Sequence, residues 1–170
     1  MAVPIDVWQG EIAELEVDAL VVSASESLFM TSGAAASVKR RGGDAIERAA
    51  VEQGPVSVGT AVVTGAGTLA ASYIIHAVAV GHDRRGDPDA LSRAIGAALA
   101  VAEPLQLRRM AFALVGVEHG AFTSDDAARV LVGTLVDGAG MLESAVIATA
   151  NPGETRAVAD ALSALRQPAP

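Results

Sequence analysis

Short apolar segments of strand length alternate with helix-start signals along most of this 170-residue chain. Six segments have this character: Val3 to Trp8, Ala19 to Ala24, Ala61 to Gly65, Tyr73 to Val80, Met110 to Gly116 and Ser144 to Ala150. Four of them, beginning with the run at 19–22, are apolar almost throughout, which is typical of strands covered on both faces by helices. The first instead alternates, with Val3, Ile5 and Val7 on one side, and this pattern predicts an edge strand.

Capping residues between these segments predict the helices. Gly42 and Gly43 should end a helix that begins near Gly33, and Asp44 with Glu47 has the pattern of a reciprocal cap for the next helix. Three longer helices are expected to begin at Asp87 with Pro88, at Thr123 or Ser124, and at Asn151 with Pro152. Their buried faces should carry Leu91, Ile95 and Leu99; Val130, Leu131 and Leu135; and Val158, Leu162 and Leu165.

Strands and helices that alternate in this way predict a mostly parallel sheet between helical layers. The two runs that flank residues 65–71 are too close for a helical crossover, so we expect that pair to be antiparallel. The fold class is therefore α/β, a three-layer α/β/α sandwich with a mixed, mostly parallel sheet. The length and the lack of repeats or linkers predict a single domain over residues 1–170, with a frayed tail at 167–170.

Composition excludes several classes of partner. The net charge is -8, so the overall electrostatic field repels nucleic acid. The only basic cluster in the sequence is Lys39-Arg40-Arg41, so nucleic acid is not expected as a ligand. No apolar stretch reaches the roughly 18 residues of a spanning helix, and the start lacks the pattern of a secretory signal, so we expect no membrane partner and a cytoplasmic location. The chain has no cysteine, and no pair of histidines has metal-ligand spacing on a helix, so we expect no metal and no cofactor.

Two loops of small residues follow strand ends and lead into helices, Ser23 to Ala36 and Gly116 to Thr123. In open α/β sheets a ligand lies beyond the carboxyl ends of the strands. Backbone N–H groups at a helix N-terminus can hold a phosphate without any cationic side chain. Both loops are candidate phosphate-binding segments, but glycine and serine are also ordinary loop formers.

The order of these features resembles the macro domain, the ADP-ribose-binding (Appr-1-p processing) family, and most closely its bacterial and archaeal members. The resemblance runs from about residue 3 to residue 140 and rests on Gly10-Glu11-Ile12, Val17 to Val22, the loop Ser23 to Ala36, Val62 to Gly67 and Tyr73 to His76. It implies the α/β/α fold and, as partner, ADP-ribose or a related adenine nucleotide. The oligomeric state is left open.

The resemblance also implies the site residues. Glu11 stands where the family has an aspartate that accepts from the adenine amino group, with Ile12 beside it. Ser23 and Ser25 would line the distal ribose. The diphosphate would be held by the backbone of Ser32, Gly33 and Ala34 and by that of Gly116, Val117, Glu118, His119, Gly120, Ala121 and Phe122, with Phe122 covering the ligand.

This chain departs from the family at several of these positions. Ser23 and Ser25 replace two asparagines, and Ala35 stands where hydrolytic members often carry the aspartate that activates water. An alanine cannot act as a base, so we expect weak or no hydrolysis. The central glycine of the second loop falls on Glu118, whose charge would repel a diphosphate if it pointed inward.

Three functions are therefore open. The leading one is binding of ADP-ribose or a related adenine nucleotide through the backbone amides of the two loops. The second is an ADP-ribosyl hydrolase, for which His119 is the candidate base. The third is a ligand-free assembly or regulatory module, which a site filled by the Met30 or Glu118 side chain would favour. Of the other histidines, His76 is expected in the core and His82 in solvent.

Overall fold

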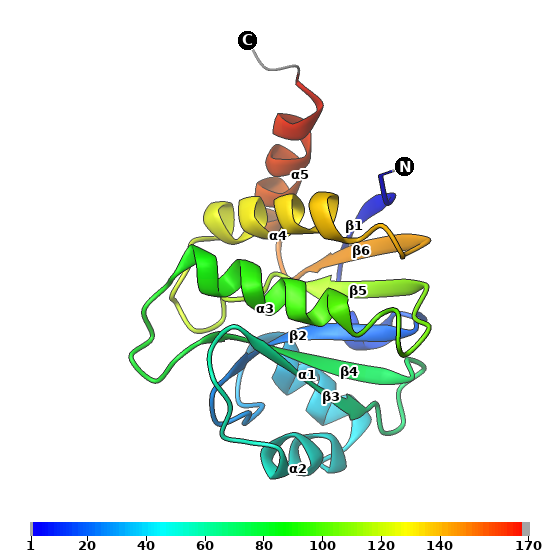
Figure 1. The fold of residues 1–170 in the computed structure, drawn as a ribbon, viewed down its shortest axis with the longest axis vertical. Helices are drawn as coiled ribbons and strands as arrows, with labels where there is room; N and C mark the ends of the chain where they lie inside the picture. Colours follow the sequence, from blue (N-terminus) through cyan, green and yellow to red (C-terminus); the bar gives the residue numbers. More distant parts are fainter. Residues whose placement is uncertain (1, 168–170) are drawn as a thin grey trace.

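The computed structural model describes residues 2–167 and places six strands in one sheet of order β1-β6-β5-β2-β4-β3 (Figure 1). The strands are β1 Ile5–Gln9, β2 Ala19–Ser25, β3 Thr60–Gly65, β4 Tyr73–Val80, β5 Arg109–Ala113 and β6 Ser144–Thr149. Every neighbouring pair is parallel except β3 with β4, which is antiparallel as expected. β1 lies at one edge, so the alternating pattern of the first segment is explained.

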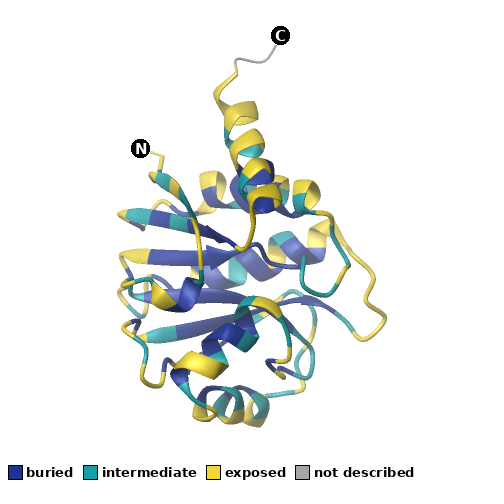
Figure 2. Ribbon diagram, turned by 180° about the vertical axis from the view of Figure 1, so that it is seen from behind, coloured by how far each residue is buried: buried dark blue, intermediate teal, exposed yellow. Residues whose placement is uncertain are grey.

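Helices cover both faces of this sheet, which confirms the three-layer α/β/α fold (Figure 1). One face carries α3 Pro88–Ala100, α4 Ser124–Gly138 and α5 Pro152–Arg166, and the other carries α1 Gly33–Gly42, α2 Ala45–Glu52 and a 3-10 turn, η1 Ile12–Glu14. Neighbouring side chains of a strand point to opposite faces. Accordingly, Val21 packs in the core under α3 and α4, whereas Leu20 and Val22 pack under α1. Figure 2 shows these strands as a buried layer between helices with exposed outer sides.

The caps of the three longer helices follow the sequence. Asp87 accepts from the Asp89 N–H at 3.0 Å, Thr123 accepts from the Asp126 N–H at 3.1 Å, and Asn151 accepts from the Glu154 N–H at 2.9 Å. These side chains satisfy N–H groups that a first helical turn cannot pair internally. The predicted starts of α3, α4 and α5 are confirmed.

The reciprocal cap predicted for α2 is wrong. Asp44 already has helical backbone angles and makes no capping hydrogen bond. Glu47 accepts instead from the Met30 N–H at 2.7 Å and from the Lys39 ammonium at 2.8 Å. The carboxylate thus joins α2 to α1 and to the loop before α1, contacts that the local sequence does not reveal.

Two further expectations need correction. The fifth strand ends at Ala113, and the next three residues form the first part of a loop, in which Gly116 has φ +96°. On α5, Leu165 is 52% exposed, because the last turns of the helix extend beyond the sheet (Figures 1 and 2). Of the tail predicted to fray, residues 168–170 lie outside the described residues.

Candidate functional site

The carboxyl ends of β1, β6, β5 and β2 meet at one edge of the sheet, because these four strands are parallel neighbours. A cleft of about 390 Å³ opens there. It is lined by Gly10, Glu11, Ile12, Gly33, Ala34, Ser37, Arg40, Ala113, Leu114, Glu118, Ala148, Thr149, Ala150 and Glu154. Its position agrees with the rule that ligands of open α/β sheets lie beyond the strand ends.

The turn after β1 forms one end of the cleft. The Gly10 N–H donates to the Thr149 carbonyl at 2.9 Å and so ties this turn to the end of β6. Ile12 is buried, whereas the Glu11 carboxylate accepts from the Ser37 hydroxyl at 3.2 Å and pairs with Arg40 at 3.3 Å. It also pairs with Arg41. The predicted adenine-binding carboxylate is therefore held in place by groups on α1.

These pairs also account for the basic cluster of the sequence. Lys39 pairs with Glu47, and Arg41 pairs with Glu14 as well as with Glu11. Acidic side chains from η1, its preceding turn and α2 thus neutralise the cluster.

The N-terminus of α1 forms the floor of the cleft, where a phosphate would be expected. Gly33 begins the helix with φ +59°, a left-handed conformation that glycine adopts without strain. A β-carbon on Gly33 would collide with the Cγ of Glu118. The side chain of Glu118 therefore lies directly on the first residue of α1.

Glu118 places a carboxylate in an unusual environment. Its Oε2 atom is buried and has no hydrogen-bond partner among residues 2–167. Burial raises the pKa of Glu118 to about 7, and the Glu154 carboxylate acts in the same direction; the backbone N–H of Glu118 itself, the Ala34 N–H and the Ser23 hydroxyl act against it. The carboxyl group is thus only partly ionised near neutral pH.

The loop after β5 is braced by its own contacts. The Gly116 N–H donates to the buried Ser23 hydroxyl at 3.1 Å. The Phe122 ring packs against Gly116, so closely that a β-carbon there would be 2.6 Å from the ring. Ser23 and Phe122 therefore contact protein at positions where the resemblance implied contacts with a ligand.

His119 and Ser25 lie outside the lining of the cleft. His119 is half-buried, and burial and the nearby Arg84 lower its pKa. The Ser25 hydroxyl is 3.1 Å from the Ser27 hydroxyl. Of the residues predicted from the sequence, the cleft brings together Glu11, Ile12, Gly33, Ala34 and Glu118, whereas Ser23, Ser25, Ser32, Gly116, Val117, His119, Gly120, Ala121 and Phe122 are not part of its lining.

Sequence reasoning missed the segment after β6. Thr149 and Ala150 end that strand, and Glu154 lies in the first turn of α5 with its carboxylate accepting from the Ala150 N–H at 2.6 Å. The sequence does contain a signal for this segment: Asn151 caps a helix directly after a strand, and the two candidate loops likewise lead from a strand into a helix. Only the strand order reveals that β6 lies between β1 and β5 and so brings this junction to the same cleft.

The other histidines lie as expected. His76 is buried, with its Nε2 3.0 Å from the Thr64 hydroxyl. His82 is exposed and pairs with Glu26 at 3.3 Å.

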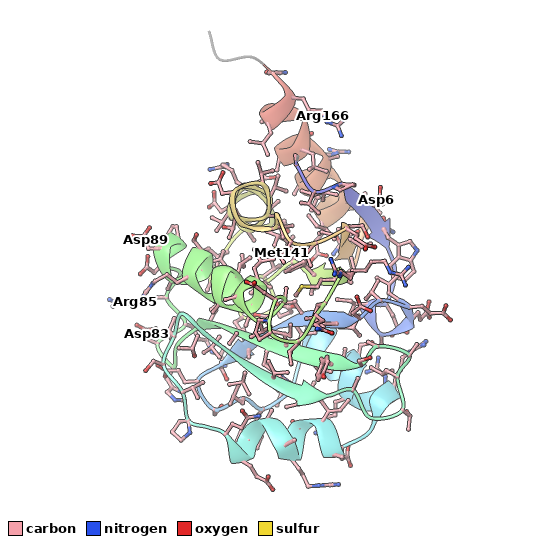
Figure 3. All side chains as sticks on the ribbon, turned by 45° about the vertical axis from the view of Figure 1, so that its right-hand side comes forward. Asp6, Asp83, Arg85, Asp89, Met141 and Arg166 are labelled. Atoms are coloured by element: carbon pink, nitrogen blue, oxygen red, sulfur yellow. The ribbon has the colours of Figure 1, made fainter. Side chains whose placement is uncertain are left out.

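A second hollow, of about 460 Å³, lies between the ends of β2 and β4. Charged residues of both signs line it, among them Glu26, Asp83 and Arg85. Asp83 and Arg85 lie at the outer edge of the molecule (Figure 3), and the Asp83 carboxylate accepts from the Arg85 N–H at 3.1 Å. Because its charged groups are exposed and balanced, this hollow is a weaker candidate than the cleft.

Residues 2–167 contain no cluster of three or more side chains placed to hold a metal ion. Within the same range, no helix has the length and apolar character needed to cross a membrane.

Known proteins resemble this chain in sequence. The family model of the macro domain matches residues 21–131. Uncharacterized proteins of Mycobacterium bovis and Mycobacterium tuberculosis are each 34% identical over 133 residues, which are 78% of this chain and 37% of theirs. An uncharacterized protein of Aquifex aeolicus is 35% identical over 75% of this chain and 78% of its own length. This chain thus spans little more than a third of its mycobacterial relatives.

Solved structures resemble it in fold. The Trypanosoma brucei macrodomain in complex with ADP-ribose superposes with a TM-score of 0.85 at 22% identity, over 93% of this chain and 68% of that one. The Oceanobacillus iheyensis macrodomain with ADP superposes with a TM-score of 0.84 at 17% identity, over 94% and 90% of the two chains. At these identities the superpositions establish the architecture alone.

Proposed function

This chain belongs to the macro domain family, and we propose that its cleft binds ADP-ribose or a related adenine nucleotide with little or no hydrolysis. The observation that carries this proposal is the anion already lying at the α1 N-terminus. The Ala34 N–H faces the Glu118 carboxylate there, so the helix presents its positive end to a negative group. The same amides would face a phosphate if Glu118 moved aside.

The open end of the cleft supports adenine binding. Ile12, Ala148 and Leu114 supply an apolar lining, and the Glu11 carboxylate can accept from an amino group at its edge. Mostly apolar pockets with a few fixed polar groups are typical of small-molecule sites. Solved macrodomains with ADP-ribose and ADP bound share this fold.

Titration calorimetry with ADP-ribose tests the proposal. We expect saturable heat with the wild-type protein and an affinity at least about tenfold lower with Glu11→Ala, because one hydrogen bond to a charged group contributes about 1.5–3 kcal/mol. The matched control is Glu14→Ala, which removes a neighbouring acid that pairs with the same Arg41. No heat with either ADP-ribose or adenosine at millimolar concentration, or equal losses in the two variants, would contradict the proposed adenine site.

Little in the site supports hydrolysis. Ala35 is buried and carries no base, and His119 is not part of the cleft lining. We expect that an ADP-ribosylated protein incubated with this chain loses its label no faster than in buffer. Turnover that His119→Ala abolishes would restore the hydrolase alternative.

A second candidate function is a domain that binds no nucleotide and serves as an assembly or regulatory module. The position of Glu118 on Gly33 favours it, because the side chain fills part of the phosphate position. Met30 does not contribute, since it is buried in the core under α1. The titration above separates this candidate from the first.

A further inference from the structure

Glu118 is a buried acid without a counter-charge. Its Oε2 has no hydrogen-bond partner among residues 2–167, and the charged group that acts on its pKa is another carboxylate, Glu154. A buried carboxyl group is costly unless it is paired and hydrogen-bonded. Because it has no such partner, the Glu118 carboxyl group does not stabilise the fold by pairing. Its position in the cleft instead affects which ligands can bind.

The cations around the cleft are already paired. Arg40 lines the cleft but pairs with Glu11, and its side chain is 66% exposed. Lys39 pairs with Glu47 of α2. Within the described residues, the carboxyl groups of Glu118 and Glu154 line the cleft together with the N-terminus of α1, and Arg40, the one cation in that lining, is paired with Glu11.

We propose that Glu118 is the residue that determines the charge specificity of the cleft. Its carboxylate occupies the position of the ligand's phosphates, so the site discriminates against a diphosphate and favours adenine ligands with little or no negative charge there. The inference rests on the proposed function and narrows the expected ligands to the adenine compounds with the least negative charge.

Two features of the site carry this discrimination. The contact with Gly33 is steric, because a phosphate and the Glu118 side chain cannot share the same space. Like charges placed together in an interface are also unfavourable. The adenine end, around Glu11 and Ile12, is untouched by either effect.

A ligand series with increasing negative charge measures the specificity. Adenosine, AMP, ADP and ADP-ribose are titrated into the wild-type protein, Glu118→Gln and Glu118→Ala at pH 8. In the wild type we expect affinity to stay level or fall along the series. In Glu118→Ala, ADP-ribose should bind at least about tenfold more tightly than in the wild type, as expected for the loss of more than 1.4 kcal/mol of repulsion.

The affinity for adenosine should change by less than about threefold in Glu118→Ala, because adenosine has no phosphate to meet the carboxylate. Glu118→Gln keeps the volume of the side chain and removes its charge. Its affinity for ADP-ribose should therefore lie between that of the wild type and that of Glu118→Ala. Glu14→Ala removes an equal charge from the rim and should leave the order of the series unchanged. Thermal unfolding of each variant shows whether the fold persists.

The outcomes separate the two proposals. If Glu118→Ala binds adenosine and ADP-ribose with the same ratio of affinities as the wild type, the inference is overturned and nucleotide binding stands. If no variant binds any member of the series, both the inference and the proposed function are overturned. A selective gain for the charged ligands supports both.

Discussion

At the scale of single residues, the site depends on one pair, Gly33 and Glu118. Gly33 provides the space and the left-handed turn with which α1 begins, and the Glu118 side chain fills that space. Neither residue is informative alone, since glycine is common in loops and glutamate is common on surfaces. Their contact makes the N-terminus of α1 an anion site that is occupied by the protein itself.

The affinity for ADP-ribose should depend on pH through Glu118. Because its pKa is raised to about 7, the carboxyl group is mostly ionised at pH 8 and mostly protonated at pH 6. The repulsion of a diphosphate is therefore lost as the pH falls, and affinity should rise by up to about tenfold over this interval. Calorimetric titrations of the wild type at pH 6, 7 and 8 measure the effect.

Other charged groups around the cleft set the controls for this prediction. Glu154 faces Glu118 from α5, His119 follows it in the loop beside Arg84, and Glu11 lies across the cleft. Glu118→Gln keeps all of these groups and removes only the titration of Glu118. A pH dependence equally steep in Glu118→Gln would assign the effect to another residue.

At the scale of elements, the cleft is built where four strand ends and two helix starts come together. The start of α1 supplies the Ala34 N–H, and the start of α5 supplies Glu154. Side chains from distant segments hold the neighbouring loops in place, as Ser23 holds Gly116 and Glu47 holds Met30. These hydrogen bonds fix the loops to the sheet, so the site is preorganised.

Two predicted caps should respond differently to the same substitution. Thr123→Ala removes a side chain that accepts from the Asp126 N–H, and we expect it to lower the free energy of unfolding by about 1 kcal/mol. Asp44→Ala should change that free energy by less than about 0.5 kcal/mol, because Asp44 makes no capping hydrogen bond. Urea unfolding of both variants decides the matter, and a larger loss for Asp44→Ala would contradict the assignment.

At the scale of the whole molecule, the sheet separates a large core cluster under α3, α4 and α5 from a smaller one under α1 and η1, and a third, small cluster includes Ala50 of α2. Alanine and valine make up much of the first two, so helices approach the sheet closely. One buried polar pair lies at the β3–β4 ladder: the Thr64 hydroxyl donates to the Gly65 carbonyl at 3.0 Å and therefore accepts from the Nε2–H of His76. This assignment leaves Nδ1 of His76 unprotonated and without a partner among residues 2–167.

Acid should destabilise the fold through His76. Burial lowers its pKa from 6.5 to about 4, so between these values the unfolded chain binds a proton that the folded protein does not. The contribution of His76 to stability is therefore present above pH 6.5 and is lost as the pH falls toward 4, by up to about 3 kcal/mol, since each pKa unit corresponds to about 1.4 kcal/mol. The raised pKa of Glu118 acts in the opposite direction over the same interval, so the His76 contribution is measured as the difference in urea unfolding between the wild type and a variant without this histidine from pH 7.5 to pH 4.

The double variant His76→Leu/Thr64→Val removes the titrating group and its partner together, so that neither is left unpaired. Its stability should fall less steeply with pH than that of the wild type. His82→Gln alters an exposed histidine and should keep the wild-type slope. Parallel pH profiles for the wild type and the double variant would show that His76 does not carry the effect.

Much of the architecture was accessible from the sequence because it depends on local periodicity and chain distance. The continuous apolar run of β4 predicted a strand covered on both faces, and the short connection at 65–71 predicted its antiparallel partner. The caps Asp87, Thr123 and Asn151 act on their own first turns, so their residue types are sufficient. The loops that contain Gly33 and Glu118 were likewise identified as candidates by their place after strand ends, and the residues themselves by the resemblance to the macro domain.

Residues close together in the chain were enough to predict the alternating elements, the starts of the three longer helices and the family. The folded structure was needed to show that Glu118 points onto Gly33, that the junction after β6 brings Glu154 into the cleft, and that Glu47 anchors a distant loop. The direction of a side chain and the order of strands depend on contacts between remote segments, and no local pattern encodes them.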